Sequence, residues 1–580
     1  MCARIHRTRL VVLALAASTA VTCQGSPDDP DKPNNPDSVT TASLPGFDGV
    51  ATVRLSSLVD PCVIDSATGN LSLSVGADET VYLYERNGSV IANAYIGDVA
   101  CAVAPNKRIT IRSRDLTAQD DQKVIVDFQY GLFGLATKAY VSTDPTSGPN
   151  ILIDLGAGAG DSVKIIGTNG ADTITLGSDL SANPHAALIN VQAAPAAKRS
   201  FPDIRITGAE DIIVSTGPGN DVITGQAGTA VGATAAPLEG SIRLTVYGGA
   251  DNDVITSGAA STGGASNDLY GGAGDDIFIQ QLATAADDIH GDDGVDLVDY
   301  SHRTAPVIIT VGVGQSDDGE SGEGDTIEAD IEDLIGGSGN DTLDFTGMDV
   351  ASHLLIGGPG DDRLIGAAKA DHLYGGEGND VLVGGGGDDV LEGGDGDDVL
   401  QGGQGNDTIQ GGGLNCPLTT PATCVAATNA KIGSNVVDYS DRVARVFVNL
   451  ANLTASPTGE TGEADTLLNI ASIRGGAGND VLTGDDGSNV IWGGPGDDVI
   501  RGGGGDDALY GEGGDDQLYG EAGNDFLCGG AGADTLVGGD GNDLIDADDG
   551  ERDSVIDCGV GDADLVFSDS ADPTPIACEM

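Results

Sequence analysis

Basic residues are scarce in this chain of 580 residues. It has 26 Lys and Arg against 91 Asp and Glu, which gives a formal net charge of −65 at pH 7. Nucleic acids and anionic membrane surfaces attract basic proteins, because their phosphates carry negative charge. The charge balance therefore excludes both as natural partners.

Motifs of the common catalytic sites are missing as well. The sequence contains no HExxH, GxSxG or GxxxxGK[ST] pattern, and its six histidines are scattered. Neighbouring acids such as Asp120 and Asp121 could do acid–base chemistry, but in so acidic a chain a solvated surface explains them better. We therefore expect no enzymatic activity.

Long apolar runs are absent beyond the N-terminus. Residues 1–23 carry Arg4, Arg7 and Arg9, then the apolar run 10–17, then small residues. This order is typical of a secretory signal peptide, which is too short for a stable transmembrane helix. No later segment is apolar for long enough to span a bilayer, so we expect an exported protein without a transmembrane segment.

The end of this signal resembles a lipoprotein cleavage box. Residues 20–23 read AVTC, although Thr22 departs from the small residues usual there, and the segment 24–45 is rich in Pro and Asp. The resemblance implies lipid attachment at Cys23, a disordered tether over 24–45 and a place outside the cell or on its outer surface, as in outer-membrane lipoproteins. The alternative is simple cleavage and release.

Cysteine usage agrees with export. Besides Cys2 and Cys23, the chain has seven cysteines, and their spacing suggests three disulfides: Cys62–Cys101, Cys416–Cys424 and Cys558–Cys578. These pairings are open to other connectivities, and the odd count leaves Cys528 without a partner. A 20-residue loop closed near the C-terminus would contribute about 3 kcal/mol in the chain-entropy model.

Glycine is abundant, and it recurs with a period of nine. From Gly357 the chain reads GGPGDDRLI-GAAKADHLY-GGEGNDVLV-GGGGDDVLE-GGDGDDVLQ-GGQGNDTIQ, and eight more units run from Gly475 to Asp546. A flexible linker does not keep Leu or Ile at the eighth position of every unit. The period therefore predicts an all-β fold, a parallel β-roll or β-solenoid in which two successive units make one coil.

Each unit combines a turn with a short strand. Glycines in the turn adopt positive φ at no steric cost and leave backbone carbonyls free to approach a cation. The sixth residue is an acid, and carboxylate and carbonyl oxygens in such number suit Ca²⁺ better than Mg²⁺. We expect metal ligands at Asp362, Asp371, Asp380, Asp389, Asp398, Asp407, Asp480, Asp498, Asp507, Asp516, Asp525, Asp534 and Asp543, and in degraded units at Asp276 and Asp341.

These units resemble the RTX family of hemolysin-type calcium-binding repeats. The resemblance implies several Ca²⁺ ions, each bound between successive coils so that aspartates two units apart, such as Asp362 and Asp380, cooperate. Two units depart from the pattern, since one has Lys369 in its turn and another has Asn489 at the sixth position. RTX proteases and lipases carry a catalytic domain before the repeats, and RTX pore-formers carry a long apolar helical domain; neither is evident here.

The rest of the chain is organised around the repeats. Residues around Asn87-Gly88 alternate polar and apolar side chains, which predicts antiparallel strands. A larger duplication relates 298–311 (VDYSHRTAPVIITV) to 437–450 (VDYSDRVARVFVNL), and we expect its tyrosines to pack. The expected domains are a signal peptide (1–23), a tether (24–45), a β-rich domain (46–150), a degenerate β-solenoid (151–345), a first β-roll (346–413), an insertion with linker strands (414–474), a second β-roll (475–549) and a C-terminal cap (550–580).

These features favour an exported calcium-binding β-roll protein that folds on Ca²⁺ and has a structural or adhesive role at the bacterial cell surface. In segment 475–549 many acids face one base, Arg501, so that without cations the segment repels itself. Its partners would be calcium and surface glycans or proteins. The alternative is a secreted hydrolase, toxin or effector that uses the β-roll as a folding and secretion module.

Overall fold

Strands are the only regular elements in the part of the chain that the structure describes. The computed structural model describes residues 63–64, 71–75, 80–86, 89–94, 99–103, 109–113, 123–127, 151–155, 161–179, 186–193, 204–207, 209–225, 242–257, 266–281, 286–312, 318–348, 351–412, 434–451, 464–561 and 563–578. The strands are mostly parallel, which confirms the predicted fold class. Within these residues no helix is long and apolar enough to cross a membrane. The expected signal peptide, tether and Cys23 lie outside the described residues.

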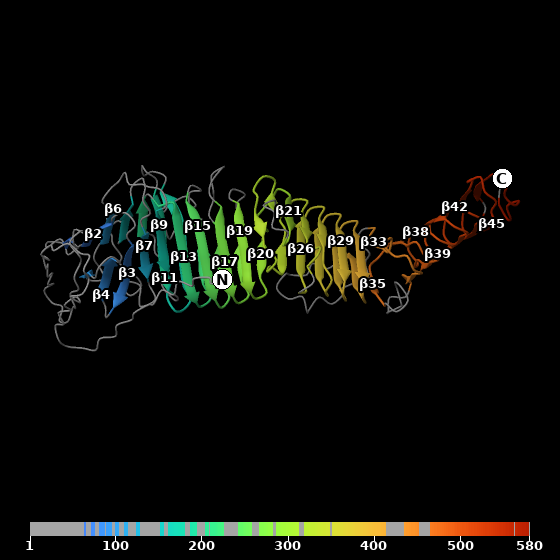
Figure 1. Cartoon of the computed structure of the whole chain (residues 1–580). Coiled ribbons are helices and arrows are strands. Elements are labelled where there is room, and N and C mark those ends of the chain that lie inside the picture. Colours follow the sequence, from blue (N-terminus) through green and yellow to red (C-terminus); the bar gives the residue numbers. More distant parts are fainter. Residues whose placement is uncertain are drawn as a thin grey trace, which may run out of the picture. The chain divides into compact units, whose positions relative to one another are not determined.

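The chain divides into two compact units. The first comprises Met1–Pro218 and Ala227–Leu238, and the second comprises Gly219–Gln226 and Glu239–Met580. In both units successive strands pair with the strand one coil further along the chain, so that parallel ladders form (Figure 1).

Two parallel ladders build the first unit. One contains β2 (Leu71–Val75), β6 (Ile109–Ser113), β8 (Ile151–Asp154) and β12 (Ile204–Thr207). The other contains β3 (Thr80–Arg86), β7 (Lys123–Asp127), β9 (Ser162–Ile166) and β13 (Asp211–Pro218). Both ladders therefore begin within the region 46–150 and continue past residue 150 without a break in pairing.

Antiparallel strands extend these ladders. β3 and β4 (Ser89–Ala94) form the antiparallel pair expected around Asn87-Gly88, and β4 pairs on its other side with β5 (Val99–Val103). The remaining members are β1 (Val63–Ile64), which pairs with β2, and β10 (Asp172–Asp179) and β11 (Ala186–Ala193), which form a hairpin next to β12.

The second unit contains four ladders, numbered here in chain order. Ladder 1 comprises β15 (Arg243–Ala250), β17 (Asn267–Ala273), β19 (Asp287–Asp293) and β23 (Thr326–Ile327). Ladder 2 comprises β14 (Val222–Thr224), β16 (Val254–Thr256), β18 (Ile277–Ile279), β20 (Leu297–Asp299), β24 (Asp333–Ile335), β26 (Leu354–Pro359), β28 (His372–Glu377), β30 (Val390–Asp395), β32 (Thr408–Gly412) and β35 (Thr466–Leu468).

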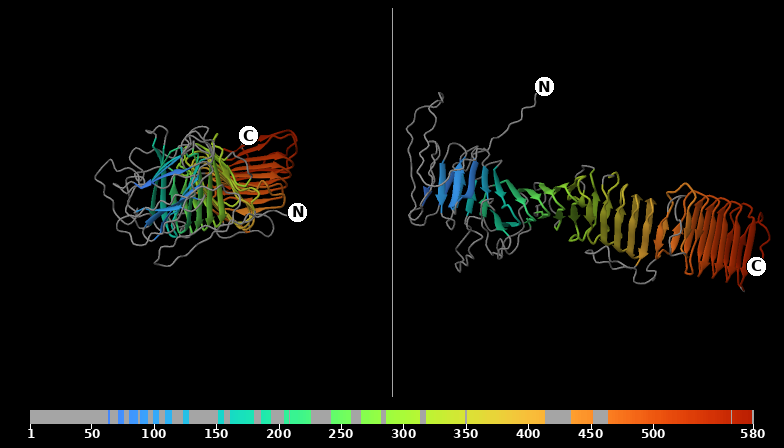
Figure 2. Two further views of the ribbon diagram at one scale, coloured as in Figure 1. Left: turned by 60° about the vertical axis from the view of Figure 1, so that its left-hand side comes forward. Right: turned by 90° about the horizontal axis from the view of Figure 1, so that it is seen from below.

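Ladders 3 and 4 complete the unit and reach the C-terminal coils (Figure 2, right). Ladder 3 comprises β21 (Val307–Thr310), β25 (Thr342–Asp344), β27 (Arg363–Ile365), β29 (Val381–Gly386), β31 (Val399–Gln404), β33 (Val436–Asp438), β36 (Ser472–Arg474), β38 (Val490–Pro495), β40 (Ala508–Gly513), β42 (Phe526–Ala531), β44 (Leu544–Ala547) and β46 (Leu565–Ser568), with the short antiparallel β22 (Gly319–Glu320) beside β21. Ladder 4 comprises β34 (Phe447–Asn449), β37 (Val481–Thr483), β39 (Val499–Gly504), β41 (Gln517–Ala522), β43 (Thr535–Asp540) and β45 (Val555–Val560).

The interior is the column of Leu and Ile that the repeats predict. In both β-rolls every eighth-position side chain is 0% exposed, and Leu364 pairs in register with Leu382 and then Leu400. Each such side chain contributes about 1.5–3 kcal/mol through burial. Because the outer positions of the short strands are only half-buried, this thin column is the main apolar core of each roll.

The large duplication marks the places where one ladder replaces another. At the first copy, ladder 1 ends at β23 and ladder 3 begins at β21, while ladder 2 continues. At the second copy, ladder 2 ends at β35 and ladder 4 begins at β34, while ladder 3 continues. We call these two places junctions. At each copy of the duplicated sequence, one of the two facing sheets therefore ends and a new sheet begins in its place.

Candidate metal sites

The sixth-position aspartates point inward and form hydrogen-bonded rows. The backbone N–H of Asp380 donates to Oδ1 of Asp398, two units further on, at 3.0 Å, and the N–H of Asp362 donates to Oδ1 of Asp380 at 2.8 Å. These side chains are 0–2% exposed. Aspartates two units apart are thus neighbours, as the coil length predicts.

Four such rows run through the two β-rolls, in the direction of the chain. Their members are Asp341, Asp362, Asp380, Asp398 and Asn435; Asp371, Asp389, Asp407 and Asp465; Asp480, Asp498, Asp516, Asp534, Asp553 and Asp572; and Asn489, Asp507, Asp525, Asp543 and Asp564. A fifth row precedes them with Asp221, Asp253, Asp276, Asp296 and Glu332, although long insertions separate its repeats.

In many of the turns that carry these row residues, the second carboxylate oxygen is buried and makes no hydrogen bond. This oxygen, Oδ2, faces the first glycine of its own unit, because a Cβ on Gly375 would collide with Oδ2 of Asp380 and lie 2.5 Å from the Gly393 carbonyl oxygen. We call such a turn open. Open turns with an unpartnered, buried Oδ2 occur at Asp253, Asp276, Asp296, Asp362, Asp380, Asp389, Asp398, Asp498, Asp516, Asp525 and Asp543.

A second kind of turn satisfies both carboxylate oxygens with the protein's own backbone. Oδ2 of Asp341 accepts the Gly337 N–H at 2.5 Å, and Oδ2 of Asp480 accepts the Gly476 N–H at 2.8 Å. We call such a turn closed. The units that depart from the repeat pattern are closed too: Ala367 N–H donates to Asp371 Oδ2 at 2.7 Å, and Asp485 N–H donates to Asn489 Oδ1 at 2.8 Å. Each of the four rows therefore begins with a closed turn.

The backbone at the second residue of the unit distinguishes the two kinds. In the open turn of Asp380 this residue, Gly376, has a φ of 128°, whereas Gly337 and Gly476 of closed turns are not in the positive-φ region. At Glu512 and Glu521 even a non-glycine residue adopts positive φ, at 74° and 76°. Such a conformation costs about 1–2 kcal/mol for a residue with a side chain. The open turn thus turns the N–H away from the carboxylate, at no steric cost where the second residue is Gly and with local strain at Glu512 and Glu521.

Burial makes the open rows electrostatically unfavourable in the absence of a cation. Burial, followed by the charges of Asp407 and Asp371, raises the pKa of Asp389 to about 8. Burial likewise raises the pKa of Asp516 to about 7, with Asp498 and Asp534 adding to the shift. A carboxylate held in such surroundings at neutral pH needs a compensating positive charge.

The donor atoms of an open turn fit a calcium ion. Each offers a buried carboxylate oxygen with no protein donor and a backbone carbonyl oxygen from the next coil, in most cases that of a glycine, and both are hard ligands of the kind Ca²⁺ prefers. Only oxygen ligands are offered, and the absent side chain of the first glycine leaves the space beside them. Among the described residues no three His, Cys, Asp or Glu side chains gather around one point, so backbone carbonyls would have to complete any coordination shell.

Beside each buried row lies an exposed row with hydrogen bonds in the opposite direction. It is formed by the fifth residues of the units, where Asn379 N–H donates back to Asp361 Oδ1 at 2.9 Å and Asp397 N–H donates to Asn379 Oδ1 at 2.9 Å. These bonds lower the pKa of members such as Asp388, whose carboxylate accepts from the backbone and side chain of Asn406. The exposed row needs no cation, because backbone N–H groups and asparagine amides donate to its side-chain oxygens.

The duplicated tyrosines close rows without a metal. Tyr300 and Tyr439 are 0% and 1% exposed, as the expected packing role requires. Their hydroxyls donate to Oδ2 of Asp325 at 2.6 Å and of Asp465 at 2.8 Å, while Oδ1 accepts the backbone N–H of Asp287 in the first copy and of the row member Asp407 in the second. The tyrosine hydroxyl therefore satisfies the oxygen that stays unpartnered in an open turn.

Buried arginines accompany these tyrosines. Arg303 donates from Nε to the Gln280 carbonyl at 2.8 Å and forms an ion pair of 2.6 Å with Glu323. At the equivalent place in the second copy, the Arg442 guanidinium donates to the Gly403 carbonyl. Both junctions are thus held by hydrogen bonds between groups of the chain itself, without a metal ion.

The sequence-predicted ligands fall into both classes of turn. Asp276 and most aspartates of the two β-rolls lie in open turns, Asp407, Asp507 and Asp534 share the positive φ at the second residue, and Asp341, Asp371 and Asp480 lie in closed turns. The rows also include members beyond the sequence-predicted ligands, such as Asp296, Asp465, Asp553 and Asp564. Asp296 could have been found, since GDDGVDLVD at 291–299 is a recognisable unit.

One of the three suggested disulfides falls within the described residues. Cys558 and Cys578 are joined, with their Cα atoms 5.1 Å apart, and Cys528 is a free, half-buried thiol. Burial and nearby acids such as Asp546 raise the pKa of that thiol. Cys62, Cys416, Cys424 and the side chain of Cys101 lie outside the described residues.

Comparison with known families agrees with this geometry. The model of the RTX calcium-binding nonapeptide repeat (4 copies) matches residues 213–229, 245–261, 328–344, 356–391, 392–413, 472–500, 492–527 and 529–551. No curated protein matches the chain. The matched segments contain the open turns of both β-rolls, so the repeats found by family comparison and the carboxylate rows coincide. The chain therefore contains RTX calcium-binding nonapeptide repeats, folded as β-rolls.

Proposed function

We propose that this protein is exported, folds on binding Ca²⁺, and serves as a structural or adhesive element at the bacterial cell surface. The observation that carries the proposal is the set of open turns, in which buried carboxylate oxygens have no protein partner. Asp380 and Asp398, for example, would hold an ion together with the Gly393 carbonyl. When bound, Ca²⁺ supplies the positive charge that the buried rows lack.

Export fits this chemistry. Calcium is abundant outside cells, and extracellular modules bind it with Kd of about 0.1–1 mM. An acidic chain that cannot collapse without calcium would remain unfolded until it is exported. The signal-like N-terminus, the lipoprotein-like residues 20–23 and the disulfide-forming cysteines support the same proposal. Surface glycans or proteins are the proposed partners.

Calcium-dependent folding is tested by circular dichroism of the full mature chain. In excess chelator the β-sheet signal should be small, and it should appear cooperatively as free Ca²⁺ rises toward the millimolar range. A matched titration with Mg²⁺, which demands a smaller octahedral site, should produce much less signal. A full β-sheet signal without free calcium would refute the proposal.

The cellular address is tested with Cys23→Ser in producing cells. If Cys23 carries lipid, the variant should leave the membrane fraction or keep its signal peptide, while the wild type stays bound. A variant that matures and fractionates like the wild type would show simple secretion instead. The adhesive role is tested by binding of the purified protein to immobilised surface glycans and proteins, which should require Ca²⁺ and be lost in chelator.

A further inference from the structure

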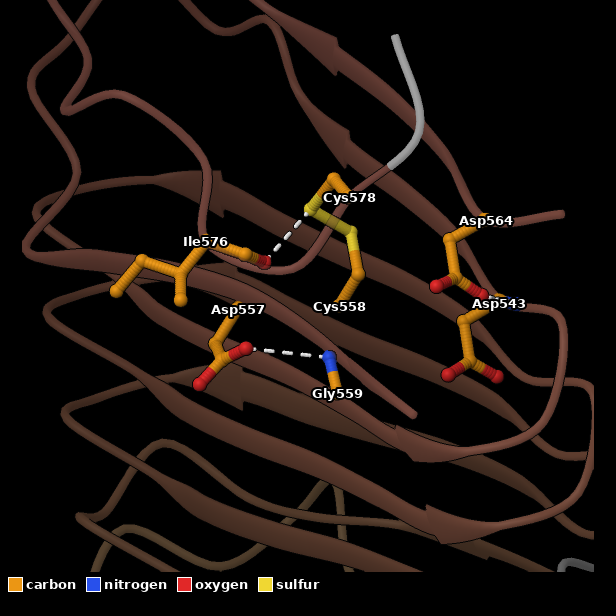
Figure 3. Close-up of a disulfide and its surroundings, with 7 residues drawn as sticks. All are labelled: Asp543, Asp557, Cys558, Gly559, Asp564, Ile576 and Cys578. Carbon is orange, nitrogen blue, oxygen red and sulfur yellow. Dashed lines mark hydrogen bonds between the residues drawn. A yellow bond between two sulfur atoms is a disulfide. The ribbon is translucent and has the colours of Figure 1, made fainter. Parts of the chain in front are cut away.

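The last coil of the second unit brings a disulfide next to a carboxylate row. Cys558 belongs to β45, is 0% exposed and is bonded to Cys578. The tail around Cys578 adds to β45 as a further strand would, since Cys558 N–H donates to the Ile576 carbonyl at 3.0 Å and Ile576 N–H donates to the Ile556 carbonyl at 2.9 Å. Figure 3 shows the disulfide with Asp543 and Asp564 beside it.

The carboxylate row continues into this coil. The N–H of Asp543 donates to Oδ1 of Asp564 at 3.0 Å, and the two side chains are 2% and 0% exposed. Oδ2 of each is buried and makes no hydrogen bond. Gly559 has a φ of 87°, and its N–H donates to Asp557 Oδ1 at 3.1 Å, away from the row (Figure 3). The turn after Cys558 is therefore open.

Cys558 takes the place of the glycine that supplies a carbonyl in regular coils. In the preceding coil a Cβ on Gly520 would meet Oδ2 of Asp525 and the carbonyl oxygen of Gly538. In the last coil a Cβ on Gly538 would meet Oδ2 of Asp543 and, at 2.7 Å, the carbonyl oxygen of Cys558. The same pairing of carboxylate and carbonyl oxygen is thus present, but the carbonyl belongs to a disulfide-bonded residue.

We propose that Asp543, Asp564 and the Cys558 carbonyl form a final Ca²⁺ site, whose affinity is set by the Cys558–Cys578 disulfide. The site extends past residue 551, where the match to the calcium-binding repeats ends. It rests on the proposed calcium-dependent folding of the rolls and adds a redox control to it. Cys558 connects the two, because one residue provides both the carbonyl oxygen and the sulfur.

The coupling follows from what the disulfide fixes. While it is intact, the segment 576–578 is tied to β45 and holds this strand through two hydrogen bonds, one from the Cys558 N–H and one to the Ile556 carbonyl. A dithiol reductant gives two electrons and two protons, so that the S–S bond breaks, two thiols form and the reductant closes to a cyclic disulfide. The freed tail then no longer orders the Cys558 carbonyl. By linkage, calcium must in turn protect the disulfide from reduction by the same factor.

The first measurement is hydrogen–deuterium exchange of the full mature chain at increasing free Ca²⁺, with and without Cys578→Ser. The free Ca²⁺ needed for half-protection of 543–567 should rise about tenfold in the variant, a typical coupling between linked sites. Segment 490–516, which lies earlier in the same roll, serves as the internal control and should keep its midpoint. An unchanged midpoint at 543–567 would overturn the proposal.

The second measurement is the equilibrium fraction of reduced Cys558–Cys578 in mixtures of reduced and oxidised dithiothreitol, read by alkylation and peptide mass spectrometry. Saturating Ca²⁺ should lower the equilibrium constant for reduction about tenfold more in the wild type than in Asp564→Asn, which keeps the hydrogen-bonding Oδ1. An equal shift in both proteins would overturn the proposal. If calcium fails to protect 490–516 at all, the proposed calcium-dependent folding is itself wrong, so the two failures are distinguishable.

Discussion

The same substitution, Asp to Asn, should have opposite effects on the stability of the calcium-free fold at an open turn and at a closed turn of one row. Asp516→Asn changes an open turn and Asp480→Asn changes a closed turn two coils earlier. Each removes one charge, keeps the side-chain size and keeps Oδ1 for its backbone donor, which lies 2.7 Å away at Asp516 and 2.9 Å away at Asp480. The difference lies in the second oxygen, which has no donor at Asp516 and accepts the Gly476 N–H at Asp480.

The magnitude follows from the pKa of the open-turn acid. Burial raises the pKa of Asp516 from 3.8 to about 7, so that keeping it ionised at pH 8 costs the ligand-free fold on the order of 4 kcal/mol at most. Asp516→Asn removes this cost and should stabilise the calcium-free fold. Asp480→Asn instead places an amide N–H₂ against the Gly476 N–H and should destabilise it by about 1–3 kcal/mol.

The assay uses an osmolyte that favours burial. In chelator at pH 8, the trimethylamine N-oxide concentration needed for half-folding by circular dichroism should fall for Asp516→Asn and rise for Asp480→Asn. In saturating Ca²⁺ without osmolyte, the β-sheet signal should recover less in Asp516→Asn than in Asp480→Asn, because Asp516→Asn has lost a calcium ligand. If the two variants shift in the same direction in chelator, the acids act only as a diffuse negative field and the distinction between the turns is wrong.

Further predictions concern protons, glycines, the junctions and catalysis. Because burial raises the pKa of the open-turn acids, the calcium-free fold should lose stability as pH rises from 4 to 8, and the free Ca²⁺ needed for half-folding should fall or stay level, and not rise, as pH falls from 8 to 6; a calcium-free stability that does not change with pH would contradict this. Gly375→Ala should abolish one site and destabilise the roll by about 2 kcal/mol, whereas Gly513→Ala, with open space around it, should be nearly neutral in urea unfolding. Tyr439→Phe removes the hydroxyl that donates to Oδ2 of the buried Asp465 and should cost about 1–3 kcal/mol with or without calcium, unlike the exposed Tyr247→Phe. Purified protein should not turn over peptide, ester or glycoside substrates; turnover that is lost on mutating residues within 46–150 would show an enzyme.

The strand ladders and the interior could be predicted because they depend on side-chain type at a fixed period. Leu364, Leu382 and Leu400 recur in every second unit and stack in register, as the nonapeptide requires. The aspartate rows followed from the same period. The row also accepts irregular spacing, such as the longer step from Asp543 to Asp564, because insertions are placed in the turns while the backbone donor of each coil keeps its position.

The distinction between open and closed turns could not be predicted from residue types. Gly337 and Gly358 are both second-position glycines, yet only Gly358 adopts positive φ. The reason is the preceding coil: the segment after Gly337 donates from Ser338 N–H to the Arg303 carbonyl of the junction at 3.0 Å, and the segment after Gly476 bonds the Arg442 carbonyl in the same way at 2.8 Å. A contact with a part of the chain far away in sequence therefore determines the local backbone.

The order of closed and open turns along each row predicts the direction in which the coils fold on binding calcium. Every row of the β-rolls starts with a closed turn that the protein satisfies alone, and only then do open turns follow. Two rows end on groups that also need no ion, the Asn435 amide and the Asp465–Tyr439 pair. A first coil that is stable without metal presents its hydrogen-bonding groups to the next coil, which lowers the cost of ordering that coil around an ion. Calcium-driven folding should therefore spread from the junctions toward the C-terminal end of each roll, in blocks bounded by the closed turns.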